Sequence, residues 1–405
     1  MEVFLARQPI FDTGLKVVAY EILYRSGNKN TYDISINGDL ATASVVIDAL
    51  INFGIGQLAG EKGVFVNFTR NLLMEDLPYV FEPDRLTVEI LETLDVDEAL
   101  VEKCRILKER GYTIALDDFT GDNRFDELMP YVDIIKVDFL VLQSEGRQYI
   151  AEKYLPLGVK LLAEKVETNA DYLEAVDLGY HFFQGYFFEK PIICKSKGIS
   201  HSSLRYMSLL NETMSEEPDF NHLAEIIKQD YSLTYKLLRL INSPAFYTVQ
   251  EITSVNHALT LLGLNEIRKW TTLILMKDIS EDKPDELLKV SLSRALFAEK
   301  LSVLFGMDSR STEAFLLGLF SLIDTVLEQP VYDIIEPLPL HDDIKSAMIG
   351  GNNTFHEILR LIKHYELGNW DIVIDIEDQN HLSSERVNDY YLAAISEASN
   401  LFNQM

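Results

Sequence analysis

The sequence has few cysteines, no long apolar run and a deficit of basic residues, and each shortage excludes a class of protein. Cys104 and Cys194 lie far apart with no second Cys or His at ligand spacing, which argues against a disulfide scaffold and a zinc site. No apolar stretch approaches the ~20 residues of a membrane-spanning helix, and the N-terminus lacks the apolar segment of a signal peptide. We therefore expect reduced thiols, no membrane span and a cytoplasmic location.

Basic residues number 36 against 64 acidic ones, so the formal net charge is -28 at pH 7. This charge repels nucleic acid and anionic membranes, and direct nucleic-acid binding is not expected. A phosphate-bearing ligand is not excluded, because divalent cations held by clustered carboxylates turn an acidic cleft into a phosphate site.

What the sequence does contain is a series of short apolar runs, each followed by a polar residue. Six such runs end at Asn67, Glu89, Asp117, Lys136, Glu164 and Gln184. Their intervals of about 19 to 28 residues suit a strand, a loop and one helix per repeat. Two further strands flank the turn signal Asp12-Thr13-Gly14 as a hairpin. The sequence therefore predicts an α/β fold, a TIM-like (β/α)8 barrel with its active site at the strand C-termini.

Helical spacing of apolar residues separates the strands, over residues 40–55, 96–111 and 170–179. The alternation stops near Pro191, and the polar, lysine-rich stretch 195–201 has the composition of a linker. Beyond it the apolar spacing is helical throughout. We expect two domains, an α/β barrel over residues 1–197 and an all-α domain over residues 198–405.

The residues at the predicted barrel mouth indicate a metal site. Candidate ligands at or near strand ends are Glu21, Asn67, Glu89, Asp117, Asp118 and Glu164. Such hard oxygen donors suit Mg²⁺ or Mn²⁺ rather than zinc. Two ions ~4 Å apart hold a phosphodiester and activate a water, which Lys136 would then orient or deprotonate. For each acid taken singly, capping of the next helix or exposure to solvent is the competing interpretation.

The same residues carry motifs that resemble the EAL-type cyclic di-GMP phosphodiesterases over residues 1 to 195. The segment 21–25, EILYR, resembles the E-A-L-x-R motif with Ile22 in place of alanine. Six further segments follow in the family's order: VNFT at 66–69, EILE at 89–92, DDF at 117–119, KVD at 136–138, AEKVE at 163–167 and QGY at 184–186.

The resemblance implies hydrolysis of cyclic di-GMP to pGpG with two Mg²⁺ or Mn²⁺ ions. One ion would be bound by Glu21, Asn67, Glu89 and Asp117, and the second by Asp117, Asp118 and Glu164. The implied catalytic residues are Lys136, Glu164 and Gln184. Arg25 and Asp138 would bind substrate, and Glu92 would anchor the loop after Phe119.

Two departures from the family pattern keep a second function open. The loop after Phe119 is TGDNRF, residues 120–125, where the family has a glycine-rich loop that couples metal binding to dimerisation. Lys165 stands where glycine is usual. The intact ligand set favours a phosphodiesterase. Because the family's loop takes part in dimerisation, the resemblance leaves a homodimer open. The altered loop favours a catalytically silent sensor of cyclic di-GMP.

Residues 200–390 resemble the HDOD domain, a catalytically silent relative of the HD phosphohydrolases. The segments that carry this resemblance are DYSLT at 230–234, LLRLINSPAF at 237–246 and HALTLLGLNEIRKW at 257–270. Residues 318–324 lack the His-Asp pair of the HD hydrolases, and we expect His257 to be a core or capping residue. The resemblance implies a regulatory domain that contacts an unidentified protein partner.

Overall fold

The computed structural model describes residues 3–26, 55–185, 209–215, 218–242, 252–280, 283–327, 329–338 and 340–404. The chain divides into two compact units, Met1–Lys190 with Leu361–Asn400, and Pro191–Arg360 with Leu401–Met405. The predicted helix at 40–55, apart from its last residue, and the predicted linker at 195–201 lie outside the described residues. The division after residue 197 also falls there and stays a prediction.

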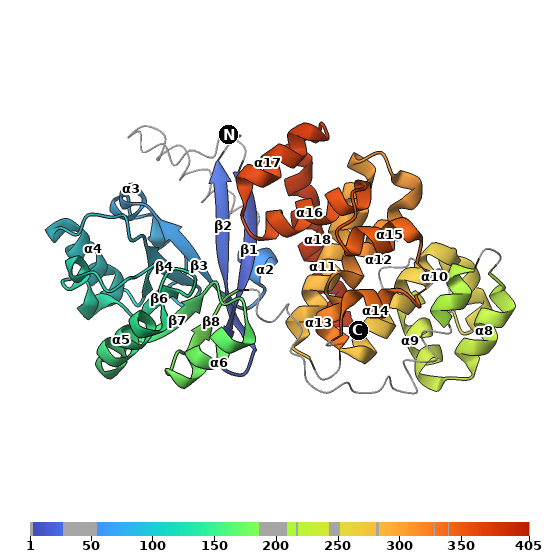
Figure 1. Ribbon diagram of the computed structural model, residues 1–405, viewed down its shortest axis with the longest axis horizontal. Helices are drawn as coiled ribbons and strands as arrows, with labels where there is room; N and C mark the ends of the chain where they lie inside the picture. The colour runs from blue at the N-terminus through green and yellow to red at the C-terminus, as the bar shows by residue number, and fades with distance from the viewer. Residues whose placement is uncertain are drawn as a thin grey trace. The chain divides into compact units, whose positions relative to one another are not determined.

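Eight strands of the first unit close into a barrel in sequence order, which confirms the predicted fold (Figure 1). They are β1 (Val3–Asp12), β2 (Val17–Ser26), β3 (Gly63–Phe68), β4 (Leu86–Ile90), β5 (Thr113–Leu116), β6 (Ile134–Asp138), β7 (Lys160–Glu164) and β8 (Phe182–Phe183). β1 runs antiparallel to both β2 and β8, and the other pairs are parallel. The reversal follows from the predicted hairpin, whose turn is closed by Asp12 Oδ1, the acceptor for the Gly14 and Lys16 N–H groups.

Helices connect the strands and complete the first unit. They are α2 (Ile55–Ala59), α3 (Arg70–Met74), α4 (Glu98–Glu109), α5 (Ser144–Tyr154), α6 (Asn169–Asp177), α17 (Trp370–Gln379) and most of α18 (Ser384–Gln404), together with the end of α16 (Thr354–Glu366). α4 and α6 confirm the helices predicted at 96–111 and 170–179. Asp97 caps α4 by accepting the Leu100 N–H at 2.9 Å, and Thr168 and Asp171 form a capping box on α6.

A layer of apolar side chains fills the barrel below its mouth: Ile10, Ala19, Phe65, Ala115, Ile134 and Leu162. Because side chains alternate between the two faces of a strand, the residue two positions further along points into the same interior. In the direction of the strand C-termini, those residues are Glu21, Asn67, Asp117, Lys136 and Glu164. The polar layer at the mouth therefore follows directly from the strand period.

The second unit is helical throughout its described residues, as the sequence predicts. Its helices are α8 (Phe220–Lys228), α9 (Tyr231–Ile241), α10 (Val255–Ile279), α11 (Asp285–Leu304), α12 (Ser311–Leu319), α13 (Ile323–Leu327), α14 (Val331–Ile335) and α15 (Asp342–Met348), followed by the first part of α16. Gly318 allows α12 to cross α11 closely, since a Cβ there would lie 2.3 Å from the Arg294 carbonyl oxygen. His257 is exposed in the first turn of α10, so the core alternative of its prediction was wrong, and the capping alternative stays a prediction. None of the helices in the described parts of the chain is both long enough and apolar enough to cross a membrane.

Candidate active site

Lys136 lies at the centre of the barrel mouth and is fully buried. Its Nζ is 2.5 Å from Glu89 Oε1, 2.8 Å from Asp117 Oδ1, 2.8 Å from Glu164 Oε1 and 3.4 Å from Glu21 Oε1. Four carboxylates from four different strands or strand ends thus share one ammonium group. The convergence of strand C-termini predicted from the sequence is present.

The titration of these groups reflects their mutual charges. Burial opposes the charge on Lys136, but the surrounding carboxylates, Glu164 foremost, raise its pKa well above the usual value. Burial raises the pKa of Glu89 and Glu164 well above the usual range, and the ammonium of Lys136 only partly offsets this. Burial and the neighbouring carboxylates thus disfavour the charged forms of Glu89 and Glu164, and an added cation would favour them.

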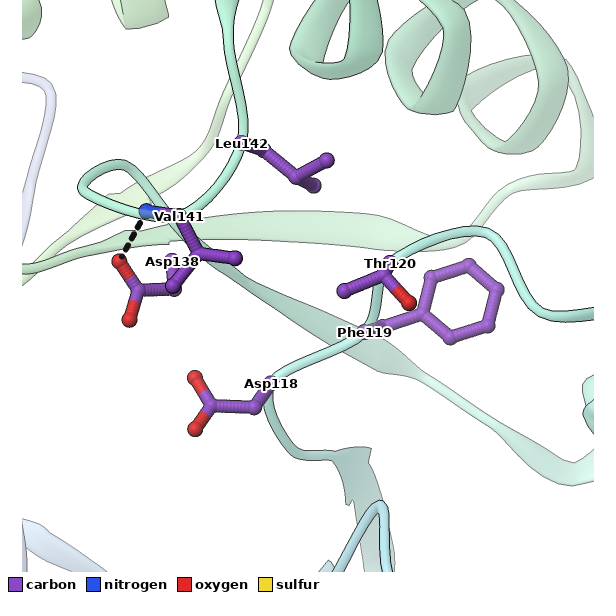
Figure 2. Close-up of a pocket in the computed structure, with 6 residues that line it drawn as sticks. All are labelled: Asp118, Phe119, Thr120, Asp138, Val141 and Leu142. Carbon is purple, nitrogen blue, oxygen red and sulfur yellow. Dashed lines mark hydrogen bonds between the residues drawn. The ribbon is translucent and has the colours of Figure 1, made fainter.

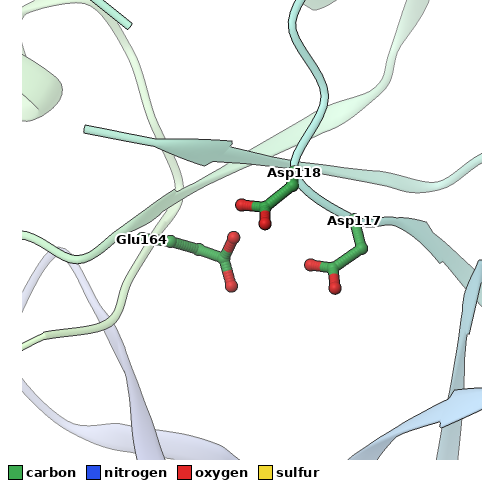
Figure 3. A group of neighbouring side chains, drawn as sticks. All are labelled: Asp117, Asp118 and Glu164. Atoms are coloured by element: carbon green, nitrogen blue, oxygen red, sulfur yellow. The ribbon is translucent and has the colours of Figure 1, made fainter. Parts of the chain in front are cut away.

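Asp117, Asp118 and Glu164 point toward one another at the end of β5 and β7 (Figure 3). One carboxylate oxygen from each lies within 4.8 Å of the others. The backbone at Asp118 has a φ of 39°, in the left-handed region that Asp tolerates better than most residues. This turn ends the strand alternation, so that neighbouring carboxylates reach the same side.

The residues present fit divalent cations. Five carboxyl groups, with Asp118 added to the four around Lys136, gather about one fully buried ammonium, and they outnumber the ammonium groups even when Lys165 beside Asp118 is counted. Glu89 Oε2 and Asp118 Oδ1 are buried oxygens that accept no hydrogen bond within the described residues. Carboxylate oxygens of this kind are the donors that Mg²⁺ and Mn²⁺ prefer.

Glu21 is held from two sides by amides. Asn67 Nδ2 donates to Glu21 Oε1 at 3.3 Å, and Gln184 Nε2 donates to Glu21 Oε2 at 2.6 Å. Gln184 Nε2 also donates to Gln8 Oε1 at 2.9 Å. Both amides predicted at the strand ends therefore lie in the site.

Lys165 follows the last residue of β7, and its ammonium pairs with Asp138 and lies 3.7 Å from Asp118 Oδ1. Its backbone has a φ of 51°, a conformation that favours glycine. Asp138 Oδ1 accepts the N–H groups of Leu140 at 2.7 Å and Val141 at 3.1 Å. Figure 2 shows Asp138 and Asp118 on the border of a small pocket lined also by Phe119, Thr120, Val141 and Leu142.

The loop after Phe119 is fastened to Glu92, although its sequence departs from the family pattern. Arg124 donates to the Glu92 carbonyl oxygen, and Asp122 accepts the Arg124 N–H at 3.0 Å. Burial raises the pKa of Glu92, and the charges of Asp117 and Asp118 add to the shift. Arg25 lies in β2 opposite Phe4, but its side chain is outside the described part of the structure.

Sequence reasoning missed Gln8 as a member of the site and the contacts of Lys165. The hairpin register pairs Gln8 with Glu21. Gln8 is also two residues from Ile10 of the apolar layer, toward the mouth because β1 is antiparallel. Pairing the residues of the two predicted strands outward from the turn at Asp12-Thr13-Gly14 could have placed Gln8 opposite Glu21.

Comparisons with known proteins agree with this architecture. The EAL domain model matches residues 2–191, and the HDOD domain model matches residues 203–329. The uncharacterized protein YuxH of Bacillus subtilis is 40% identical over 413 residues, covering 100% of both chains. The cyclic di-GMP phosphodiesterase CdgJ of Vibrio cholerae is 32% identical over 385 residues, covering 93% of this chain and 89% of CdgJ.

Solved structures with an EAL domain are also similar. The Bacillus subtilis YkuI protein, in complex with cyclic di-GMP and calcium, is 21% identical over 61% of this chain and 69% of YkuI, with a TM-score of 0.40. That score is too low to carry an argument. The family assignment rests on the two domain matches and on the relatives aligned over nearly their whole length. The chain belongs to the family of proteins in which an EAL domain is joined to an HDOD domain.

Proposed function

We propose that this chain is a metal-dependent phosphodiesterase that hydrolyses cyclic di-GMP to pGpG. The observation that carries the proposal is the meeting of Asp117, Asp118 and Glu164 within 4.8 Å beside the ammonium of Lys136, at the mouth of an EAL barrel. The name of the relative CdgJ supports the choice of cyclic di-GMP as substrate.

Mg²⁺ and Mn²⁺ both suit the donor set. We assign Glu21, Asn67, Glu89 and Asp117 to one ion, and Asp117, Asp118 and Glu164 to the other. When bound, the two ions supply the positive charge that holds a phosphodiester and lowers the pKa of a water.

The remaining side chains orient the reactants. We assign Lys136 to hold the attacking water and the phosphate oxygens near Glu164. Its three N–H groups point at Glu89, Asp117 and Glu164 here, so this role requires that bound metal ions take over those carboxylates. Gln184 Oε1 is buried and accepts no hydrogen bond from the described residues, so it is open to accept one from that water.

Substrate binding is assigned to Arg25, whose planar donor fork matches a phosphate. Both carboxylate oxygens of Asp138 are already engaged, by the turn that follows β6 and by Lys165. Within the described residues, Asp138 Oδ2 accepts only from Lys165, so it keeps one acceptor position through which Asp138 can bind a substrate donor beside that ammonium. Glu92 keeps its proposed place as the anchor of the loop after Phe119.

The HDOD half completes the proposal as a regulatory domain that contacts a protein partner. Within its described residues, α12 and α13 carry no His-Asp pair, since Asp324 follows Ile323. A homodimer through the barrel and a cytoplasmic location stay predictions.

The test is to incubate the purified full chain with cyclic di-GMP and MgCl₂ or MnCl₂ and to measure pGpG by chromatography. We expect metal-dependent pGpG formation that falls to background in Asp117→Asn. The matched control is Glu109→Gln, which alters an exposed carboxylate paired with Arg105 on α4 and should retain wild-type turnover. Turnover that survives in Asp117→Asn would refute the assignment of the site.

A catalytically silent sensor is the second candidate, and the ammonium of Lys165 beside Asp118 favours it. A cation at that position competes with a metal ion for the same carboxylate. Saturable binding of cyclic di-GMP in calorimetry, without pGpG in any metal, would establish the sensor and exclude the enzyme.

A further inference from the structure

The edge of β1 that faces β8 is largely unpaired within the barrel. Among the described residues, β8 pairs with β1 only at Phe11 and Asp12. In the described part of the chain, no strand accepts the backbone N–H groups along the remaining length of this side of β1. An open edge of this kind must be covered or satisfied in another way.

The segment Leu361–Asn400, which belongs to the same compact unit, satisfies this edge. Asn388 Oδ1 on α18 accepts the Leu5 N–H at 3.2 Å, and Tyr391 Oη accepts the Arg7 N–H at 3.4 Å. The hydroxyl of Tyr365 donates to the same Asn388 oxygen at 3.0 Å, and all three side chains are buried. α18 thus takes the place of a longer eighth strand.

The turn between α16 and α17 lies against the mouth itself. Gln8 Nε2 donates to the carbonyl oxygen of Glu366, the last residue of α16, at 3.4 Å. A Cβ on Gly368, whose φ is 67°, would lie 3.0 Å from Leu23 Cδ1. Leu23 is two residues beyond Glu21 on β2, so this turn approaches the site from above the carboxylate layer.

Hydrogen bonds continue from this turn to the carboxylate cluster without a break. Gln8 donates to Glu366 O and accepts from Gln184 Nε2, which in turn donates to Glu21 Oε2. Gln8 has both halves of its amide engaged, one toward α16 and one toward the site. Its orientation therefore depends on where α16 ends.

We propose that the α16–α17 turn, acting through Gln8, positions Gln184 and Glu21. Gln8 is a positioning residue, since it acts through Gln184. α16 begins at Thr354 in the helical unit and ends in the barrel unit, so the turn is a point at which the helical half can set the geometry of the mouth. The inference rests on the proposed function for its effect on rate, but its effect on metal affinity is independent of turnover.

The first experiment uses Gln8→Met, which keeps the length of the side chain and removes both hydrogen bonds. We expect about tenfold lower kcat with KM within about twofold, and about tenfold weaker Mn²⁺ binding by electron paramagnetic resonance, as for other residues that orient a metal ligand. In Gln8→Met/Gln184→Met, kcat should equal that of Gln184→Met alone, because the two residues act in series. If the kcat reductions of the two single variants multiplied in the double variant, the two residues would act independently and the proposal would be overturned.

The second experiment perturbs the turn from its other side. Gly368→Ala adds a methyl group against Leu23 and should lower kcat and Mn²⁺ affinity in the wild type but cause no further loss in Gln8→Met. Gly306→Ala is the matched control, since Gly306 has a φ of 69° with nothing within 4 Å of its Cβ position. Gly306→Ala imposes the same backbone strain as Gly368→Ala without the contact to Leu23, so kcat and Mn²⁺ affinity should be unchanged.

These readouts separate the two ideas. If the wild type makes no pGpG, the proposed function fails, and Mn²⁺ affinity in Gln8→Met still decides the inference. If the wild type turns over and Gln8→Met matches it in kcat and Mn²⁺ affinity, the inference fails alone. Should Gln8→Met not fold, Gln8→Asn shortens the reach of the amide and carries the same expectation.

Discussion

Removal of the Lys165 ammonium tests how the departure from the family's glycine affects the metal site. Lys165 Nζ lies 3.7 Å from Asp118 Oδ1, and the Lys165 side chain is 50% exposed. An ion bound ~2 Å from that carboxylate oxygen would lie within ~6 Å of the ammonium, and at ~4 to 6 Å in a water-like medium a unit charge repels a divalent ion by about 1 to 2 kcal/mol. With solvent screening, we expect a repulsion of about 1 to 2 kcal/mol between Lys165 and an ion held by Asp118.

Lys165→Met and Lys165→Gly should therefore each bind Mn²⁺ about 5- to 30-fold more tightly than the wild type. Titration calorimetry on metal-free protein measures this directly. The two variants differ in the backbone, because methionine keeps the left-handed conformation while glycine relieves a cost of about 1 kcal/mol. Lys165→Gly should thus be the more stable of the two in urea unfolding. Metal affinity that is unchanged or weaker in both variants would refute the reasoning.

Three further predictions concern the barrel unit. Lys136→Met leaves the buried carboxylates without their cation and should lower the free energy of unfolding by about 3–5 kcal/mol in EDTA, with a large part restored by Mn²⁺. Urea unfolding in EDTA and in Mn²⁺ checks this. An unchanged unfolding midpoint in EDTA would contradict it. Burial raises the pKa of Cys104 to about 12, so iodoacetamide at pH 8 should leave this thiol unmodified until the protein is unfolded, as peptide mass spectrometry would report. Gly185→Ala places a Cβ 2.3 Å from the Val166 carbonyl oxygen at a φ of 140° and should lower the free energy of unfolding by more than about 3 kcal/mol. Gly158→Ala, with a positive φ but an open Cβ position, should lower it by about 1 kcal/mol. Equal losses in the two variants would refute the role of the clash.

The barrel and most of its site could be predicted because both follow from a local pattern. On β3, β5, β6 and β7, the residue two positions beyond the apolar core residue is polar and lies at the barrel mouth. The period of the strand decides the direction of the side chain, and parallel pairing brings the ends together. No knowledge of distant contacts is needed for Asn67, Asp117, Lys136 or Glu164.

The features that could not be predicted depend on long-range contacts or on backbone conformation. Leu5 and Asn388 are 383 residues apart in sequence, and no local signal in α18 marks Asn388 as a cap for a strand edge. The sequence also does not predict the left-handed backbone conformation at Asp118 and Lys165, because neither residue type requires it. These conformations decide that Asp118 joins Asp117 and that Lys165 reaches Asp138.

Lys136 explains how this site can fold before any metal ion is bound. Its ammonium contacts Glu21, Glu89, Asp117 and Glu164, and it thereby makes the burial of four carboxylates tolerable. Because all four of these carboxylates are also the assigned metal ligands, bound ions would compete with the Lys136 ammonium for the same oxygens. Tighter metal binding therefore weakens the contacts that hold the Lys136 ammonium, and tighter ammonium contacts weaken metal binding. A substitution that loosens Glu21, such as one at Gln8, changes both at once, which is why metal affinity and kcat must be measured together.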